Sequence, residues 1–323
     1  MAGGDHSARA VVAALLANLG IAASKLVGFL VTGSASMLAE AIHSVADSGN
    51  QGLLLLGGHR ARRDADDTHP FGYGRERYFW AFIVALVLFS LGGGFAIFEG
   101  IEKILHPHEL ESVGVAIAIL LFALGLEGYS FRTAVIESNK VREDASWWQF
   151  IRRSRNPELP VVLLEDLAAL TGLVIALGAL TLSVVTDDPR YDGIGTLMIG
   201  LLLTAVAIVL AVEMKSLLLG ETAQPAVQEA IRTGIEREPA VERLIHLRTQ
   251  HIGPDELLIG AKVAFADGLS MQELAEAVNR VEANVREAVP EARVMYVEPD
   301  VVGPEPPDDP LATPLSARGR DGS

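Results

Sequence analysis

The sequence contains no cysteine among its 323 residues. Disulfide bonds and thiolate metal sites are therefore excluded, and a soft ion such as Cu(I) loses its preferred ligand. Basic residues are also scarce, with 26 lysines and arginines against 41 acidic residues and a formal net charge of −15. From Glu221 onward the chain has 10 basic and 19 acidic residues, which argues against nucleic acid as a partner.

Two catalytic signatures are missing as well. There is no phosphate-binding loop of the form GxxxxGK[ST], which argues against an ATP-driven pump. There is no His-Glu-x-x-His pair or comparable ligand set with a nearby base, so an intramembrane metallohydrolase is not favoured and we expect no enzyme.

Long apolar runs, by contrast, are abundant. Half of the residues are hydrophobic and the mean hydropathy is +0.33, which is typical of a membrane protein. The first run is too long for the core of a signal peptide, so residues 1–9 are expected to be a short cytoplasmic N-terminus. Residues 10–220 are predicted to form a six-helix transmembrane domain, because six runs reach the roughly 20 residues that a bilayer requires: 10–32, 36–58, 79–101, 113–133, 161–185 and 194–218.

Basic residues in the connections predict the orientation, since positive charge is retained on the cytoplasmic side. The first, third and fifth connections between the apolar runs hold little basic charge beyond Lys103 and Arg190, whereas the second and fourth are rich in it. We therefore expect an integral protein of a bacterial inner (plasma) membrane, with both termini cytoplasmic. The second and fourth connections hold the basic residues: Arg60, Arg62, Arg63, Arg75, Arg77, Lys140, Arg142, Arg152, Arg153 and Arg155.

Residues 221–302 have the pattern of a small α+β domain. A helix is predicted at about 224–238, followed by strands at 244–252 and 257–266. Ser270 and Glu273 form a capping box that opens a second helix, and a last strand is expected at 293–298. Such a sandwich leaves a sheet face for a second subunit, which favours a homodimer. Residues 303–323 are rich in proline and polar side chains and are predicted to be disordered.

His43 and Asp47 lie four residues apart in an otherwise apolar run, so both are expected on one helical face at membrane depth. An ionisable pair inside a span is costly and marks a functional site by default. Imidazole and carboxylate together suit a divalent transition metal. A hydrogen-bonding pair that only joins two helices is the alternative interpretation.

The fifth apolar run supplies two further carboxylates, Glu165 and Asp166. Asp166 is the stronger candidate to complete a metal site with His43 and Asp47 in the bilayer. Adjacent helical residues point about 100° apart, so Glu165 cannot face the same point. We assign Glu165 to metal binding only as a weaker candidate, the alternative being a role at the cytoplasmic mouth or in proton transfer.

Other polar residues in the runs have supporting roles in this interpretation. Asn50 and Gln51 follow Asp47 by one turn and are expected to orient it. Lys25 either pairs with a carboxylate or extends to the outer interface. Glu127 either relays protons or forms a salt bridge with Lys25.

Three segments together resemble the cation diffusion facilitator family of metal transporters, and within it the zinc transporter 9-like branch: AEAIHSVADSGNQ, THPFGYGRERYFWAF, and SNKVREDASWWQFIRRSRNPELPVVLLEDLAALTG. The resemblance extends from about residue 10 to residue 299. It implies six spans that carry the ion, followed by a ferredoxin-like cytosolic domain that helps to form a homodimer.

The resemblance also assigns ligands. His43 and Asp47 match the family's pair in the second span, and Asp166 matches the carboxylate of its fifth-span His-x-x-x-Asp. The histidine position of that motif is Val162, so the fourth ligand is missing. Water, Glu165 or Glu40 are the candidate replacements. Loss of an imidazole shifts the preference toward harder ions such as Mn²⁺, although Zn²⁺ remains compatible.

Peripheral metal sites of the family are only partly represented. Asp66 and His69 match ligand positions in the second connection, but Tyr73 occupies the position of the second imidazole. In the tail, His251 is a weak candidate that would need a carboxylate from another subunit. Ordinary surface roles are the alternative for both places.

These features predict a proton-coupled antiporter that exports Zn²⁺ from the cytosol, with Mn²⁺ as the other candidate. The expected substrates are the metal ion and protons, and the protein is expected to lie in a lipid bilayer. No further cofactor is expected. Ligands must lose protons to bind a cation, so metal binding and protonation exclude each other. Export of Mn²⁺, Fe²⁺ or Co²⁺ and a membrane metal sensor without transport are the alternatives, although the tail has few histidines for a sensor.

Overall fold

The computed structural model describes the backbone of residues 2–32, 35–107, 113–142 and 144–300. Within these ranges, the side chains of residues 2–7, 31–32, 35–43 and 46–47 are not described. The tail expected to be disordered, residues 303–323, lies outside the described residues. The chain divides into two compact units, Met1–Leu219 and Gly220–Ser323.

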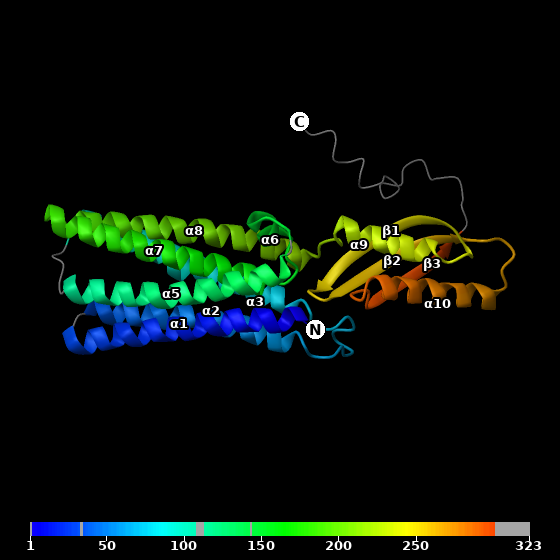
Figure 1. The fold of residues 1–323 in the computed structure, drawn as a ribbon, viewed down its shortest axis with the longest axis horizontal. Helices are drawn as coiled ribbons and strands as arrows, with labels where there is room; N and C mark the ends of the chain where they lie inside the picture. Colours follow the sequence, from blue (N-terminus) through cyan, green and yellow to red (C-terminus); the bar gives the residue numbers. More distant parts are fainter. Residues whose placement is uncertain (1, 33–34, 108–112, 143, 301–323) are drawn as a thin grey trace, which may run out of the picture. The chain divides into compact units, whose positions relative to one another are not determined.

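The first unit is helical throughout its described elements (Figure 1). A seven-residue π-helix interrupts the third apolar segment, so that α3, η1 and α4 form one long helical run. The elements of the first unit are α1 (Ala2–Thr32), α2 (Ala35–Arg60), α3 (Glu76–Val87), η1 (Leu88–Gly94), α4 (Phe95–Leu105), α5 (Val113–Val141), α6 (Trp147–Arg153), α7 (Glu158–Thr186) and α8 (Arg190–Leu219).

Among the described residues, five helical segments are long and apolar enough to cross a membrane. The predicted apolar runs match these segments, and each observed helix extends a few residues beyond its run. The remaining run, 36–58, falls in α2, where many side chains lie outside the description, so six spans stay a prediction. The five segments are Ala8–Leu30, Glu76–Leu105, Val113–Val141, Glu158–Thr186 and Arg190–Leu219.

The long helices of this unit form a closed ring of contacts. Around the ring, α1 packs against α2, α2 against α3, the α3–η1–α4 run against α8, α8 against α7, α7 against α5, and α5 against α1. Helices α1 and α7 also meet across the ring. Side chains that point into such a ring are removed from the surrounding apolar phase, which allows polar groups to be buried there.

Glycines allow the α3–η1–α4 run to approach α8 at backbone distance. A Cβ atom added to Gly100 would lie 2.5 Å from the backbone nitrogen of Leu197. A Cβ atom added to Gly200 would lie 2.6 Å from the nitrogen of Ile97. Small residues at helix contacts are typical of membrane proteins, where close packing replaces the hydrophobic driving force. These two helices therefore form a tightly packed pair.

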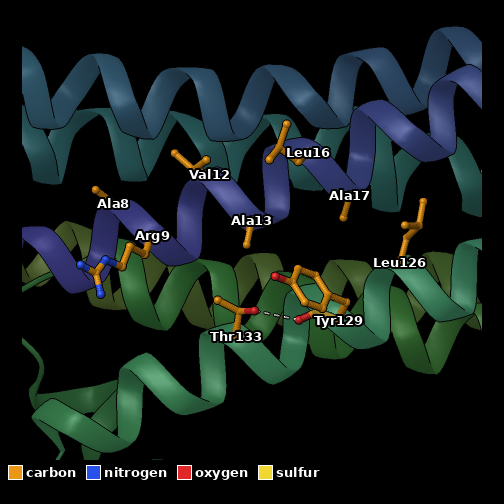
Figure 2. A pocket seen from close by; sticks show the side chains of 9 residues that line it. All are labelled: Ala8, Arg9, Val12, Ala13, Leu16, Ala17, Leu126, Tyr129 and Thr133. Atoms are coloured by element: carbon orange, nitrogen blue, oxygen red, sulfur yellow. Dashed lines mark hydrogen bonds between the residues drawn. The ribbon is translucent and has the colours of Figure 1, made fainter.

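The outside of the ring is apolar. A shallow groove of about 560 Å³ between α1 and α5 is lined by Val12, Leu16 and Leu126, with Arg9 at one end (Figure 2). Tyr129 lies at its side and is 64% exposed. Large apolar side chains exposed in this way are costly in water and favourable against lipid.

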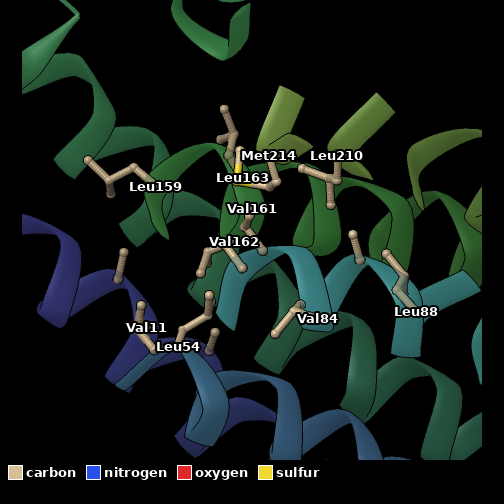
Figure 3. Packing of buried hydrophobic residues seen from close by; sticks show 14 of the residues in the cluster. Val11, Leu54, Val84, Leu88, Leu159, Val161, Val162, Leu163, Leu210 and Met214 are labelled. Carbon is tan, nitrogen blue, oxygen red and sulfur yellow. The ribbon is translucent and has the colours of Figure 1, made fainter. Parts of the chain in front are cut away.

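The inside of the ring contains a continuous apolar core. Val11 of α1, Leu54 of α2, Val84 of α3, Val162 of α7 and Leu210 of α8 are at most 2% exposed and belong to one cluster (Figure 3). These five residues come from five different apolar runs of the sequence, and packing of their side chains fixes the rotation of each helix about its axis.

The second unit has a three-stranded sheet in its described part, in the order β1–β2–β3. Strands β1 and β2 are antiparallel, whereas β2 and β3 are parallel. The predicted helices and strands agree in kind and order with those observed. The elements are α9 (Pro225–Glu236), β1 (Val241–Gly253), β2 (Glu256–Phe265), α10 (Met271–Ala288) and β3 (Val294–Asp300).

Local sequence signals explain these elements. The predicted capping box is present, because Ser270 accepts a hydrogen bond from the Glu273 amide while the Glu273 carboxylate accepts one from the Ser270 amide. Alternate residues of β2, including Leu257, Ile259 and Val263, are fully buried with the helices' apolar sides. A ferredoxin-like fold begins with a strand before its first helix. The described residues before α9 form none, so that expectation is not confirmed.

A buried ion pair in this unit predicts a pH dependence of its stability. The Glu238 carboxylate accepts two hydrogen bonds of 2.9 Å from Arg280, which hold the pKa of Glu238 below its usual value. A lowered pKa contributes stability above the usual pKa, and that contribution is lost as pH falls through the folded-state pKa. We expect acidification to weaken the fragment 220–302 more than its Glu238→Gln variant, by on the order of 1 kcal/mol because Arg280 is half exposed.

Urea unfolding of the fragment between pH 6 and pH 3 measures this difference. The exposed pair Arg237–Glu287, at 3.0 Å, provides the matched control Glu287→Gln, which should leave the pH dependence unchanged. Parallel pH curves for the fragment and Glu238→Gln would contradict the prediction.

Candidate functional site

The first half of α7 carries the two predicted carboxylates into the interior of the ring. Glu165 is 8% exposed and Asp166 is 2% exposed. Helical geometry separates them by about 100°, as expected. Their hydrogen bonds accordingly go to different helices, Glu165 to α2 and Asp166 to α5.

Glu165 is the centre of a polar network that joins three helices. One carboxylate oxygen accepts a hydrogen bond from the Asn50 side-chain amide and the other accepts one from the Gln51 amide, each at 3.0 Å. The Gln51 oxygen in turn accepts a hydrogen bond from Asn18 of α1 at 3.2 Å. A buried carboxylate requires such donors to offset the loss of water. The network therefore sets the register between α1, α2 and α7.

Asp166 has a sparser environment. Its carboxylate accepts a short hydrogen bond of 2.6 Å from the Ser130 hydroxyl of α5. Among the described side chains, no basic group lies within ion-pair distance of it. Glu127, also buried, lies on α5 three residues before Ser130. A carboxylate with one neutral donor is poorly compensated, which suits a group that later binds a cation or a proton.

Asn50 and Gln51 donate to Glu165, a contact that the sequence did not predict. Their expected role in orienting Asp47 stays a prediction. Asp47, His43 and Glu40 lie in α2, but their side chains are outside the described residues, so their predicted roles as ligands stay predictions. The Asn50 side-chain oxygen is buried and accepts no hydrogen bond from the described residues. It is therefore a further oxygen donor available beside Glu165.

Lys25 donates a hydrogen bond of 2.9 Å to the hydroxyl of Ser44 on α2. Ser44 directly follows His43 in the sequence and is itself 3% exposed. The positive charge of Lys25 is thus brought to the second span. Its predicted salt bridge with Glu127 remains a prediction.

Val162 lies one turn before Asp166 on α7 and is fully buried. It belongs to the apolar core of the bundle, beside Val11 and Leu54 (Figure 3). This position therefore offers no ligand and contributes packing instead.

The loop between α2 and α3 uses Asp66 as an internal acceptor. One carboxylate oxygen accepts hydrogen bonds from the amides of Thr68 and His69 at 3.0 and 2.8 Å, and the other accepts one from the Tyr73 hydroxyl at 2.7 Å. The Tyr73 hydroxyl and these amides hold the pKa of Asp66 below its usual value. The His69 ring stacks against Tyr73 at 4.3 Å. These contacts give Asp66 and His69 a structural role in the loop.

In the second unit, the acidic and histidine side chains near the ends of β1 and β3 also make contacts within the protein. His251 is 4% exposed near the end of β1, and its amide donates to the Glu221 carbonyl. Glu298 and Asp300 lie within 3.4 and 2.9 Å of the Lys262 ammonium. Among the described residues of the whole chain, no three histidine, aspartate or glutamate side chains come together as a metal site.

Sequence reasoning missed one charged pair of the bundle. Arg77, at the start of α3, lies 3.4 Å from Glu158, the first residue of α7, and both are buried. The sequence did contain a signal for this pair. The third and fifth apolar segments are predicted to begin at the same side of the membrane, and Arg77 and Glu158, near their starts, have opposite charges. Hydropathy alone assigned both residues to the exposed connections.

These observations define a helical integral membrane protein whose bundle encloses carboxylates between its spans. A family model described as the cation efflux transmembrane domain matches residues 11–219. The chain belongs to this family, the cation diffusion facilitators.

Similar proteins from other organisms support this family assignment. The proton-coupled zinc antiporter SLC30A9, mitochondrial, of Homo sapiens is 35% identical over 246 residues, which cover 75% of this chain and 43% of that protein. The Xenopus laevis protein of the same name is 36% identical and is covered over 44% of its length. Metal tolerance protein C4 of Arabidopsis thaliana is 30% identical, with 86% of this chain and 61% of that protein covered. The chain thus spans less than half the length of the two vertebrate relatives.

Among solved structures, a nickel form of the C-terminal domain of MamM matches 24% of this chain and 98% of its own length. The identity is 23% and the TM-score is 0.23.

The Glu165 network leads to a prediction about stability. Gln51→Leu removes one donor from the carboxylate and the acceptor from Asn18. We expect a loss of about 1–3 kcal/mol, because a buried charged acceptor is left short of a partner. The fall in melting temperature of the detergent-solubilised protein measures this loss. Asn18→Leu removes a hydrogen bond without touching Glu165 and should cost less than half as much; equal shifts would contradict the role assigned to Glu165.

Proposed function

We propose that this protein is a proton-coupled antiporter that carries a divalent metal ion, in the first place Zn²⁺, out of the cytosol. The observation that carries the proposal is Asp166, a buried carboxylate of a cation efflux bundle that accepts a hydrogen bond from one neutral donor among the described residues, Ser130. The names of the vertebrate and plant relatives, a zinc antiporter and a metal tolerance protein, agree with it. Transport, rather than catalysis, is the activity we assign.

The neighbouring helices support a shared site between α2 and α7. Gly58 lies beside Glu158, and Asn50 and Gln51 lie beside Glu165, so the two helices run antiparallel. The next turn of α2, which includes Asp47, then opposes the turn of α7 that follows Asp166. We propose that His43, Asp47 and Asp166 bind the ion between them. This set leaves one position open, as suits a site that must release its cargo.

The fourth position determines the choice of metal. With Val162 in the apolar core, the remaining candidates are water, Glu165 or Glu40, each an oxygen donor. Oxygen donors tolerate Mn²⁺, Fe²⁺ and Co²⁺ as well as Zn²⁺, so the cargo is set less strictly than by two imidazoles. Glu165 would have to exchange its two amide donors for the ion.

Proton coupling follows from the ligand chemistry. A carboxylate or imidazole that holds a proton cannot hold the cation, so protons and metal compete for the same side chains. Protons that enter from outside would then displace the ion. Alternating exposure of the site requires the helices of the ring to rock against one another.

We further propose that the end of the bundle with the basic connections faces the cytosol, in a bacterial plasma membrane, although the names of the vertebrate relatives place them in mitochondria. We also propose a homodimer. The face of the sheet that includes Arg248, Lys262 and Tyr296 points away from the buried core residues, and Tyr296 is 61% exposed. Such a mixed polar and aromatic face suits contact with a second subunit.

Removal of the Asp166 charge should abolish transport. In liposomes with an imposed pH gradient and a fluorescent Zn²⁺ indicator, we expect Asp166→Asn and Asp47→Asn to lower the flux at least about 100-fold, since even loss of a supporting partner can cost that much. Glu213→Gln is the matched control, because the Glu213 carboxylate pairs with Arg152 at 3.1 Å and is not one of the proposed ligands. Flux equal to that of the unsubstituted chain in Asp166→Asn would refute the proposed site.

Restoring the missing imidazole should change the choice of metal. Val162→His adds a softer nitrogen donor one turn from Asp166 and should raise the rate for Zn²⁺ relative to Mn²⁺ about tenfold. Val161→His places the same side chain about 100° away and should leave the ratio unchanged. If both variants keep the original ratio, position 162 does not face the ion.

A further inference from the structure

A buried ion pair closes one end of the bundle. We call this the basic end, where α2 finishes and α3 and α7 begin. The Nε atom of Arg77 lies 3.4 Å from the Oε1 atom of Glu158, and their side chains are 8% and 6% exposed. Helices α3 and α7 otherwise have little direct contact, so the pair bridges them. Buried ion pairs add little net stability compared with apolar packing, so this one calls for another explanation.

The pair forms part of the wall of a cavity of about 190 Å³. His59 and Arg62, from the end of α2 and the loop after it, line the same cavity. Its apolar wall includes Val11 and Leu54, which are 1% and 2% exposed. Those two side chains also belong to the core cluster that contains Val162 (Figure 3). The cavity is thus bounded by a charged pair and by the apolar core.

Helix α7 leads from this cavity to the candidate metal site. Glu158, Val162 and Asp166 follow one another at intervals of four residues, so they share one side of the helix. Eight residues correspond to a rise of about 12 Å. A path from the basic end to Asp166 therefore passes the ion pair first and the apolar layer around Val162 second.

The charges of the cavity oppose a cation in the closed arrangement. Arg62 and Arg77 face it from two elements, and among the described residues Glu158, which pairs with Arg77, is the one acidic lining residue. The Nη1 atom of Arg77 is buried without a hydrogen-bond partner among the described residues. Within the described residues Arg77 thus keeps spare hydrogen-bonding capacity, and its displacement would break its pair with Glu158.

We propose that Arg77 and Glu158 form a lid over a vestibule on the ion path. When the pair separates, Glu158 becomes the first carboxylate that a divalent cation meets on its way to Asp166. This inference rests on the proposed transport function. It adds to the proposed metal site an entrance at the basic end and a gate that closes this entrance.

The absence of cysteine permits a direct test in the full-length protein. Leu54→Cys places a single thiol in the vestibule wall, and a cationic, membrane-impermeant thiol reagent applied to proteoliposomes reports whether the vestibule is open. Labelling should be slow with the lid intact. It should become about tenfold faster in Glu158→Gln and in Arg77→Gln, because loss of one partner of a buried pair leaves the other charge uncompensated. The exchanged pair, Arg77→Glu with Glu158→Arg, should restore slow labelling.

Two controls accompany this test. Arg152→Gln breaks the pair of Arg152 with Glu213, which lies away from the cavity, and should not change the labelling of Leu54→Cys. Asp64→Cys, in the exposed loop after α2, reports access of the reagent to the basic end and should react quickly in every background.

If Leu54→Cys is labelled equally fast with and without the additional Glu158→Gln substitution, the lid proposal is wrong. If Glu158→Gln does not fold, Glu158→Asp shortens the carboxylate by one methylene while keeping its charge, and an unchanged rate there would overturn the lid equally. The test does not depend on flux. Faster labelling in a protein that carries none of Zn²⁺, Mn²⁺, Fe²⁺ and Co²⁺ would support the lid and refute the transport proposal separately.

Discussion

The bundle depends on one constraint, which is that a carboxylate taken out of water must find hydrogen-bond donors on neighbouring helices. Glu165 meets this constraint through Asn50 and Gln51, and Gln51 extends the network to Asn18. This network contributes to one preferred register of the three helices, to which the Lys25–Ser44 hydrogen bond between α1 and α2 adds. Apolar side chains alone tolerate sliding and rotation, whereas hydrogen bonds of about 3 Å do not.

The same constraint separates the roles of two adjacent carboxylates. Glu165 has a donor on each oxygen, so displacement of its partners by an ion would leave two buried amides without an acceptor. Asp166 has the Ser130 hydroxyl, which can donate to a charged carboxylate or accept from a protonated one. A hydroxyl therefore serves both protonation states of Asp166. The more adaptable of the two environments belongs to the residue that is proposed to exchange protons for metal.

The sequence was sufficient for those features that depend on local pattern. Apolar runs predicted the five long apolar helical segments, with ends that differ by up to eight residues, and the Ser270 capping box predicted the start of α10. It was not sufficient for features set by the rotation of one helix against another, such as the contacts of Asn50 and Gln51 with Glu165. The π-helix η1 and the Arg77–Glu158 pair were not predicted for the same reason, since both depend on close approach between segments far apart in the chain.

Val162 illustrates how one position can serve either the ligand set or the packing. An imidazole there would add a donor for the ion, but it would also place a polar, hydrated group in the layer formed with Val11 and Leu54. Valine keeps that layer dry, and a dry layer resists the passage of a divalent cation with its tightly held water. If His43, Asp47 and Asp166 bind the ion as proposed, a site with fewer ligands holds it less strongly, while the apolar layer hinders its return toward the basic end. The missing histidine and the closed basic end are then two aspects of one arrangement.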